Sequence, residues 1–423
     1  MAQVELKYGR GVLPFEFEEG RFDVLEAATG DERPLSDAEV GAAIDDPLDS
    51  QPLEEIISPG ESVLVVVSDA TRATAAAQVV NLLVRRLIQL GVAPYDLRVI
   101  FATGLHRPVT REEKSELLTP FIVQRVKTLD HDPLDESKHA RLGETESGTP
   151  IELNRALLDH SHVILTGAVG FHYFAGFTGG RKSICPGLAS ARTIEATHLR
   201  ALDFEQGGRR AGVGAGRLDG NAVHEECERI AAEVAPSFLI NTVVDAKGRA
   251  VRVHAGDWRR AHRLACAEYA DAHTVHLAEK RALVVVSAGG GPHDLNLIQA
   301  HKALEMASYA CVEGGTIILV AECAEGTGRA DFLKWFDAED AGALGRRLRE
   351  AYEVNGQTAW SLLTKTERFR VQLVSTLPAE DVRRMRMHPS GTIEEALALS
   401  GGAEGGGYVM PRGAALMPFV AGV

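Results

Sequence analysis

The sequence predicts an α/β protein of two domains, each built on a mainly parallel sheet, with the active-site cleft between the domains. The chain has 423 residues, which exceeds what one hydrophobic core comfortably holds, so two domains are the default. Short apolar runs typical of buried strands alternate with longer stretches of helical periodicity. This alternation is the pattern of β-α units, and it favours open parallel sheets.

The first series of elements begins with a buried strand followed directly by an amphipathic helix. The expected strands are 62–69, 96–104 and 162–170, and the expected helices are 75–91, 110–118 with Thr110 as its cap, and 189–201. Two β-rich runs around Ala-Lys-Gly-Arg then predict a hairpin at 238–257, followed by a helix at 258–272.

A second β-α series follows, and it places the domain boundary near residue 270. Its expected strands are 281–291, 315–322 and 370–376, with a helix at 296–310. The predicted domains are therefore 1–270 and 271–423. The Gly-rich tail at 405–423 has no fixed place in this pattern and is able to pack back on the N-terminal domain.

The composition narrows the class of partner. A formal net charge of -14 and a pI near 5.6 argue against nucleic acid or an anionic membrane, because Lys/Arg fields hold those partners. The five cysteines are widely spaced without a CxxC pair, so reduced, mostly buried thiols are expected rather than disulfides or structural zinc. The N-terminal residues resemble no secretory signal and no stretch is long enough to span a membrane, so we expect a cytoplasmic protein with a small-molecule partner.

Polar and charged residues follow three of the predicted strands in the first domain. Asp69, Thr71 and Arg72 follow the first strand, His106 follows the second and His172 the third. Ligands of open parallel sheets bind beyond the carboxyl ends of the strands. Two imidazoles are able to exchange acid and base roles, and an Arg fork grips a carboxylate. Together these residues suit a carboxylic acid whose proton is handled from two sides.

A similar arrangement occurs in the second domain, where a glycine loop joins a strand to a helix that carries Gln299 and Lys302. Spaced three residues apart, these two side chains share one helix face. They are able to point into the interdomain cleft, although an ordinary strand-to-helix turn is the simpler interpretation of the loop alone.

The segment HYFAGFTGGRKSICPG, residues 172–187, comes within one residue of a phosphate-binding loop. Arg181 stands where that pattern requires a glycine before Lys182 and Ser183. The glycines and prolines around Lys182 indicate a shaped loop that presents one amine, for which a covalent role is chemically reasonable. His198, in the next helix, is either a core histidine or a single metal ligand.

Taken as an ordered set, these motifs closely resemble the lactate racemase family that uses a nickel-pincer nucleotide. The matching stretches are Asp69-Ala-Thr-Arg72, Gly104-Leu-His106-Arg107, 172–187, His198 and 289–303. The overall correspondence covers nearly the whole chain. The resemblance implies two α/β domains with the cofactor between them. It also implies an isomerase, a 2-hydroxy-acid racemase, with enzymes of cofactor synthesis as further partners.

The resemblance also assigns roles to individual residues. The cofactor, a pyridinium-3-thioamide-5-thiocarboxylic acid mononucleotide holding nickel, would be bound covalently by Lys182 and contacted by Thr71, with His198 as the protein's nickel ligand. His106 and His172 would alternate as acid and base while a hydride moves between the substrate and the cofactor. Substrate contacts would come from Arg72 with Asp69 in support, and from Gln299 and Lys302.

The second domain departs from the lactate pattern at two positions. Ile298 stands where a tyrosine is typical and His293 where a lysine is typical. Lactate, malate and close relatives such as 2-hydroxyglutarate are therefore all open as substrates. A second substrate carboxylate would need another cation, and the candidates are Arg107, Arg181, His293 and His301.

Two other functions are consistent with parts of the sequence. A nucleotide-binding or kinase-like protein would use the GFTGGRKS loop around Lys182 for phosphate. A noncatalytic relative would bind a carboxylate through Arg72 without converting it.

Overall fold

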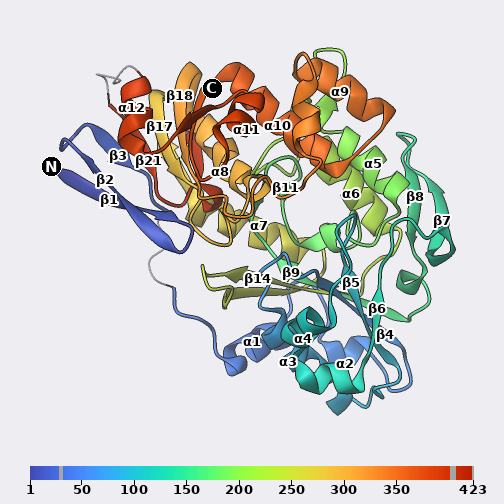
Figure 1. Ribbon diagram of the computed structural model, residues 1–423. Helices are drawn as coiled ribbons and strands as arrows, with labels where there is room; N and C mark the ends of the chain where they lie inside the picture. Colours follow the sequence, from blue (N-terminus) through green and yellow to red (C-terminus); the bar gives the residue numbers. More distant parts are fainter. Residues whose placement is uncertain (28–31, 401–405, 422–423) are drawn as a thin grey trace. The chain divides into compact units, whose positions relative to one another are not determined.

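The computed structural model describes residues 1–27, 32–400 and 406–421, which form two compact units (Figure 1). The N-terminal unit comprises 32–201 and 211–270. The C-terminal unit comprises 1–27, 202–210, 271–400 and 406–421. Both units are α/β, as the sequence predicts.

Two segments predicted to lie in domain 1–270 belong instead to the C-terminal unit. In residues 1–27, strand β3 (Phe22–Val24) pairs in parallel with β21 (Gly407–Met410). In residues 202–210, Arg209 forms an ion pair with the buried Glu305. These partners lie far along the chain, so local sequence patterns do not reveal them.

The sheet of the N-terminal unit has six strands in the order β15-β14-β9-β4-β5-β6. Their bounds are β4 (Val63–Ser68), β5 (Leu97–Ala102), β6 (Lys127–Asp130), β9 (His162–Ala168), β14 (Phe238–Val244) and β15 (Ala250–Gly256). All neighbours are parallel except β14 and β15, which form the predicted antiparallel hairpin. The three predicted strands of the first series are therefore confirmed.

Helices and smaller hairpins complete the N-terminal unit. The helices are α1 (Asp37–Asp45), α2 (Leu53–Ile56), α3 (Ala76–Gln89), α4 (Arg111–Arg125), α5 (Ala191–Leu199), α6 (Ala222–Ala232) and α7 (Arg260–His273). Two hairpins join β7 (His139–Glu144) to β8 (Pro150–Asn154), and β10 (Phe171–His172) to β11 (Gly176–Phe177). Thr110 caps α4 in a capping box with Glu113, as its sequence predicts.

The core of the N-terminal unit lies between its sheet and helices α1, α3 and α4, which Figure 1 shows together on one side of β4 and β5. Helix α3 contributes its apolar stripe, including Val80, Leu83 and Leu87, which are fully buried. Strands β4 and β5 are buried over most of their length, as expected of a parallel sheet. This packing fixes the carboxyl ends of β4, β5 and β9.

The sheet of the C-terminal unit is entirely parallel, in the order β20-β19-β18-β17-β21-β3. Its further strands are β17 (Arg281–Ser287), β18 (Cys311–Val320), β19 (Arg370–Val374) and β20 (His388–Ser390), and its helices are α8 (Leu297–Ala310), α9 (Ala341–Glu350), α10 (Val354–Arg368), α11 (Ala379–Arg384) and α12 (Ile393–Leu399). Two short pairs are β12 (Leu202–Asp203) with β13 (Gly208–Arg209), and β16 (Thr274–Leu277) with β22 (Met417–Val420).

The tail, of which residues 406–421 are described, belongs to the C-terminal unit, not to the N-terminal one. Strand β21 lies between β17 and β3 in the sheet, and β22 pairs with β16. Backbone hydrogen bonding to β17 and β3 holds β21 in a central position of this sheet.

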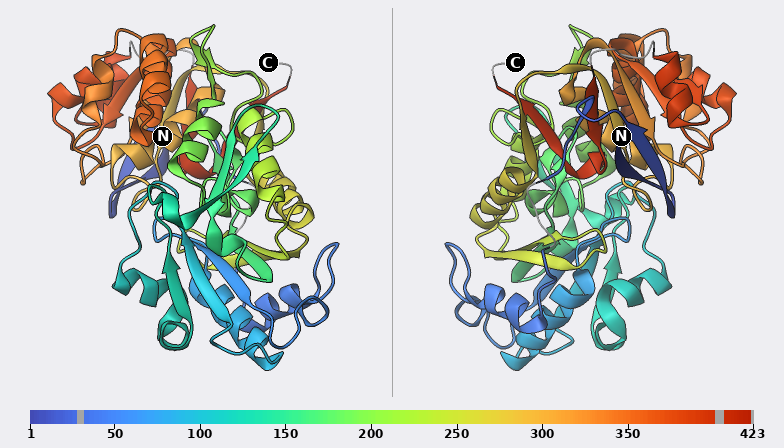
Figure 2. Two further views of the ribbon diagram at one scale, coloured as in Figure 1. Left: turned by 90° about the vertical axis from the view of Figure 1, so that its right-hand side faces the viewer. Right: turned by 90° about the vertical axis from the view of Figure 1, so that its left-hand side faces the viewer.

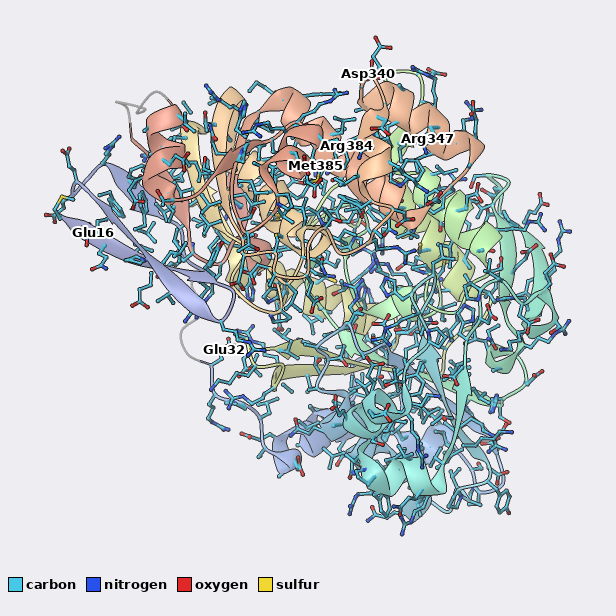
Figure 3. The ribbon with its side chains drawn as sticks, in the orientation of Figure 1. Glu16, Glu32, Asp340, Arg347, Arg384 and Met385 are labelled. Carbon is cyan, nitrogen blue, oxygen red and sulfur yellow. The ribbon has the colours of Figure 1, made fainter. Side chains whose placement is uncertain are left out.

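The chain begins with a hairpin of β1 (Ala2–Tyr8) and β2 (Gly11–Phe17), which lies beside the C-terminal sheet in both views of Figure 2. Its side chains alternate: Phe15 and Phe17 join the core that contains Leu283 and Ile318, whereas Glu16 between them points outward (Figure 3). The period of two therefore explains why one face of the hairpin is buried.

The state of the five cysteines agrees with the expectation of buried thiols. All five cysteines are buried and none forms a disulfide. Within the described part of the chain, no helix combines the length and apolarity needed to cross a membrane.

Candidate active site

The site residues predicted in the first domain gather around a topological switch point of the N-terminal sheet. Strand β4 has β5 on one side and β9 on the other, so the chain leaves β4 in one direction and returns on its opposite edge. Asp69 follows β4, His106 follows β5 and His172 follows β9. Parallel strands place these segments at the same sheet edge, where ligands of such folds bind.

Asp69 and His106 form a hydrogen-bonded pair. The Nδ1 atom of His106 lies 2.7 Å from Oδ2 of Asp69, and the Asp69 side chain is only 6% exposed, against 42% for His106. Burial raises the pKa of Asp69, but hydrogen bonds from His106 and Thr71 and the charge of Arg72 outweigh it and lower this pKa to about 2. Asp69 is thus a carboxylate, and Nδ1–H of His106 donates to it.

Thr71 and Arg72 surround the same carboxylate. The backbone N–H and the hydroxyl of Thr71 both donate to Oδ1 of Asp69, at 2.8 and 2.5 Å. No carboxylate of the described residues forms an ion pair with the half-buried Arg72. A shallow pocket lined by Asp69, Thr71, His106 and Arg107 opens here. The guanidinium of Arg72 is therefore available to an anionic ligand.

His172 lies on the tight hairpin of β10 and β11, whose connection is Tyr173-Phe174-Ala175. The backbone N–H of Ala175 donates to Nδ1 of His172 at 3.2 Å. Gly176 closes this turn with φ +79°, and a Cβ there would lie 2.0 Å from the carbonyl oxygen of Arg217. The hairpin therefore requires glycine at this position, which the sequence signals only as part of a glycine-rich stretch.

Lys182 lies in a short 3-10 helix, η3 (Gly180–Ser183). Its Nζ atom is 5.6 Å from the ring centroid of Phe174, and the Phe174 ring is 5.1 Å from that of His198. Burial and the charges of Arg72 and Arg181 hold the pKa of Lys182 well below its usual value. The lowered pKa favours the neutral amine, which is the form that acts as a nucleophile.

His198 is 8% exposed and lies near the end of α5. Burial, together with the charges of Lys182 and His106, lowers the pKa of His198 to about 3. A neutral imidazole is the form that binds a metal ion. No three His, Cys, Asp or Glu side chains of the described residues gather closely enough to hold a metal, so a metal bound by His198 would need ligands from a bound group.

Gln299 and Lys302 lie in the C-terminal unit, on α8, where Nζ of Lys302 donates to Oε1 of Gln299 at 2.7 Å. The prediction that they share one helix face is confirmed. Asn296 caps α8 through Gln299 N–H, so the helix begins where the glycine loop ends.

The four candidate cations for a second carboxylate differ in availability. Arg181 is 1% exposed and His301 is 4% exposed, and both are engaged by neighbouring groups, so neither is a surface cation. Arg107 pairs with Glu113 through two hydrogen bonds at 2.8 and 2.5 Å. His293 is exposed in the C-terminal unit. Of the four, only Arg107 lines the pocket beside His106.

The geometry does not support a phosphate-binding loop around Lys182. Such a loop joins a strand to the first turn of a long helix, whereas η3 has four residues and α5 begins only at Ala191. The buried Arg181 also occupies the position where that loop requires glycine.

Sequence reasoning missed two buried residues that hold this region. Asn221 caps α6 and donates from Nδ2 to the Phe174 carbonyl at 3.0 Å. His262 on α7 lies with Nε2 3.1 Å from NH1 of Arg181. The Asn-Ala-Val-His start of α6 is a capping signal in the sequence, but nothing there reveals its long-range partner.

Comparison with known proteins gives consistent matches over both units. Residues 8–208 match the lactate racemase N-terminal domain and residues 277–408 match the lactate racemase C-terminal domain. The lactate racemase of Thermoanaerobacterium thermosaccharolyticum is 29% identical over 79% of this chain and 78% of its own length. That of Lactiplantibacillus plantarum is 30% identical over 78% and 77%.

Solved structures agree with these matches. The lactate racemase apoprotein from Thermoanaerobacterium thermosaccharolyticum superposes with a TM-score of 0.90 at 26% identity, covering 99% of this chain and all of that one. A Thermotoga maritima protein shares the fold, with a TM-score of 0.68 at 18% identity over 92% of this chain and 99% of its own. The chain therefore belongs to the lactate racemase family.

Proposed function

We propose that this protein is a racemase, an isomerase that interconverts the enantiomers of a small 2-hydroxy acid. The relatives named as lactate racemases support the reaction class. The observation that carries the proposal is the 2.7 Å hydrogen bond between Asp69 and His106 at the switch point, where a second histidine, His172, follows strand β9. A carboxylate-backed imidazole is a strong general base.

His106 and His172 would handle the hydroxyl proton from the two sides of the substrate. The Nε2 atom of His106 takes the proton in one direction, because Nδ1–H is committed to Asp69. When the reacting carbon is held in the other orientation, the ring of His172 returns the proton. Each histidine is acid in one direction and base in the other, as racemisation requires.

Arg72 would bind the substrate carboxylate. Asp69 and Thr71, which hydrogen-bond to each other, would hold the loop that carries Arg72 in place. A guanidinium without a carboxylate partner among the described residues suits a bidentate interaction with a carboxylic acid. Gln299 and Lys302 stay proposed substrate contacts, and their mutual hydrogen bond provides an amide and an ammonium group at one point of α8.

The residues fit the nickel-pincer nucleotide that the family resemblance implies. Burial and nearby cations lower the pKa of Lys182, and burial lowers that of His198 to about 3, so the uncharged amine and imidazole are favoured. Both lie near the Phe174 ring, and the uncharged forms are those needed for a thioamide bond and a single metal–nitrogen bond. We propose that Lys182 holds the cofactor covalently, His198 ligates its nickel and Thr71 contacts it. When bound, the group would accept a hydride from the substrate carbon and return it.

The substrate would be lactate, malate or a close relative. Lactate is favoured by the names of the relatives. A dicarboxylic substrate such as malate would need Arg107 to exchange Glu113 for the second carboxylate, since Arg107 is the candidate cation in the pocket beside His106.

Intact-mass analysis tests the cofactor assignment. Protein produced together with cofactor-making enzymes should carry an adduct, and the Lys182→Ala variant should carry none. Lys247→Ala, which removes an exposed lysine, is the matched control and should keep the adduct. An adduct that persists in Lys182→Ala would overturn the proposed role of Lys182.

Chiral product analysis tests the activity and the substrate together. Cofactor-loaded protein should convert either enantiomer of at least one 2-hydroxy acid into an equal mixture. Binding of such acids without conversion would instead support a noncatalytic carboxylate-binding protein that uses Arg72. Saturable ATP binding that depends on Lys182, with no adduct, would support the nucleotide-binding alternative.

A further inference from the structure

The buried residue Arg181 has no role in the mechanism above, and its surroundings are unusual. Its side chain is 1% exposed, yet no carboxylate of the described residues pairs with it. A guanidinium stays charged inside a protein, and an unpaired buried charge is costly. Such a cost is expected where the charge holds something that the fold or the chemistry needs.

The partners of Arg181 show what it holds. NH2 donates to the carbonyl oxygen of Ala175 at 2.6 Å, and NH1 lies 3.1 Å from Nε2 of His262. The same Nε2 atom of His262 also lies 3.0 Å from the carbonyl oxygen of Thr178. The side chain is thus clamped between α7 and the turn of the β10–β11 hairpin.

Ala175 connects this clamp to the catalytic candidate His172. Its carbonyl accepts from Arg181, and its N–H donates to Nδ1 of His172 at 3.2 Å. The Nδ1 atom of His172 is therefore an acceptor, and the proton of the neutral ring lies on Nε2. In His106 the assignment is the opposite, since Nδ1–H donates to Asp69.

We infer that Arg181 is a positioning residue that fixes the orientation and tautomer of His172 through Ala175, so that the two acid/base imidazoles of the proposed racemase rest in opposite tautomers. This inference rests on the proposed function, because it gives His172 a catalytic purpose. One imidazole then offers a lone pair at Nε2 to accept the hydroxyl proton, while the other offers an N–H there that donates a hydrogen bond to the substrate oxygen. His172 transfers a proton only from its doubly protonated ring, because a neutral imidazole is far too weak an acid.

The inference also explains why Arg181 precedes Lys182. Both residues lie in the same 3-10 turn, η3. Fixing Arg181 at Ala175 places the Lys182 backbone relative to the His172 hairpin. One buried guanidinium thereby sets the distance between the proposed cofactor link and one proton carrier.

Histidine tautomers in the cofactor-free protein provide the test. Two-bond ¹H–¹⁵N correlation spectra of ¹⁵N-histidine-labelled protein, at a pH where the rings are neutral, distinguish Nδ1–H from Nε2–H for each ring. His172→Gln and His106→Gln variants assign the two signals. The expected result is Nε2–H for His172 and Nδ1–H for His106. An Nδ1–H ring at position 172 in the unmodified protein would overturn the inference without any further variant.

Reciprocal variants separate the two histidines. Arg181→Met should leave His172 as a mixture of tautomers and leave His106 unchanged, whereas Asp69→Asn should change only His106. Arg192→Met, which removes an exposed arginine paired with Glu152, is the matched control and should change neither. A folded Arg181→Met protein with an unaltered His172 tautomer would contradict the inference.

A second variant covers the case in which Arg181→Met does not fold. Arg181→Gln keeps a polar side chain but is too short to reach the Ala175 carbonyl, so the same mixture of His172 tautomers is expected. In the cofactor-loaded enzyme, displacement of His172 should lower racemisation by up to about 10²-fold. Racemisation that is absent while the tautomers are as expected would count against the proposed function and not against Arg181. Normal racemisation in Arg181→Gln with an altered tautomer would refute the positioning role.

Discussion

Two lysines with lowered pKa values, one in each unit, show how the same side chain serves different purposes. The half-buried Lys182 in the N-terminal unit has aromatic and cationic neighbours, and desolvation with the charges of Arg72 and Arg181 keeps its pKa well below the usual value. Lys365 in the C-terminal unit is fully buried, but its Nζ lies 2.6 Å from Oε2 of Glu305. The pKa of Lys365 falls only to about 8, because burial lowers it while Glu305 raises it.

The difference extends to the surroundings of each lysine. Glu305 is 1% exposed and accepts from Arg209, Lys365 and Tyr309, so every charge in that cluster has a partner. Burial alone would raise the pKa of Glu305, but the charges of Arg209 and Lys365 lower it far below the usual range. Around Lys182 the cations are not neutralised by described carboxylates. A buried charge with a charged partner stabilises the fold, whereas cations without a carboxylate partner change the pKa and the reactivity of a neighbouring side chain.

The largest expected effect is the loss of racemisation when either acid/base candidate is removed. His106→Ala and His172→Ala should fold but lose about 10²–10⁴-fold of the rate, because each removes a proton carrier and no core volume. Chiral chromatography of cofactor-loaded variants measures the rate, with His160→Ala as the control for loss of a histidine away from the sheet edge. Rates near those of the unmodified protein would remove both residues from the mechanism.

Glu305→Gln should produce the next largest effect, on stability and not on chemistry. It leaves Arg209 and Lys365 as buried charges without a carboxylate, which typically costs about 3–5 kcal/mol of unfolding free energy. Urea denaturation of cofactor-free protein measures this cost. Glu313→Gln breaks an exposed pair with Arg368 and should cost less than about 1 kcal/mol. Equal losses in the two variants would mean that the cluster does not stabilise the unit.

The fold was largely predictable where its signals are local. The runs at 62–69, 162–170 and 281–291 are apolar enough to be recognised as buried parallel strands, and each lies where it was expected. The N-terminal hairpin was not recognised although β1 and β2 pair locally. Strands β3 and β21 were not recognised, since they pair with each other across almost the whole chain. Only the pairing of β21 between β17 and β3 reveals that both chain ends share one unit.

The site was predictable as a set of residues at strand ends, because parallel strands bring those ends together. The roles within the set were less accessible. Asp69 was expected to support Arg72, and its main hydrogen bond instead goes to His106. Arg181 was considered as a substrate cation, but it is buried against the Ala175 carbonyl. Sequence spacing does not show which donor meets which acceptor across a loop.

The smallest expected effect, and the one that tests the lysine comparison directly, is the reactivity of Lys182 toward cyanate, which attacks only neutral amines. An ordinary lysine with a pKa near 10.4 is almost fully protonated at neutral pH, so its carbamylation rate should fall about tenfold for each pH unit between about 9 and 7. Burial and the charges of Arg72 and Arg181 lower the pKa of Lys182, so its rate should fall less steeply with decreasing pH than that of an ordinary lysine. At pH 7 it should exceed exposed lysines such as Lys247 by at least about tenfold. Lys365, enclosed with Glu305, should stay unmodified despite its lowered pKa. Peptide mass mapping after brief labelling of cofactor-free protein measures all three. A Lys182 rate that rises with pH as steeply as that of Lys247 would mean that the amine is charged, and the distinction between Lys182 and Lys365 would then fail.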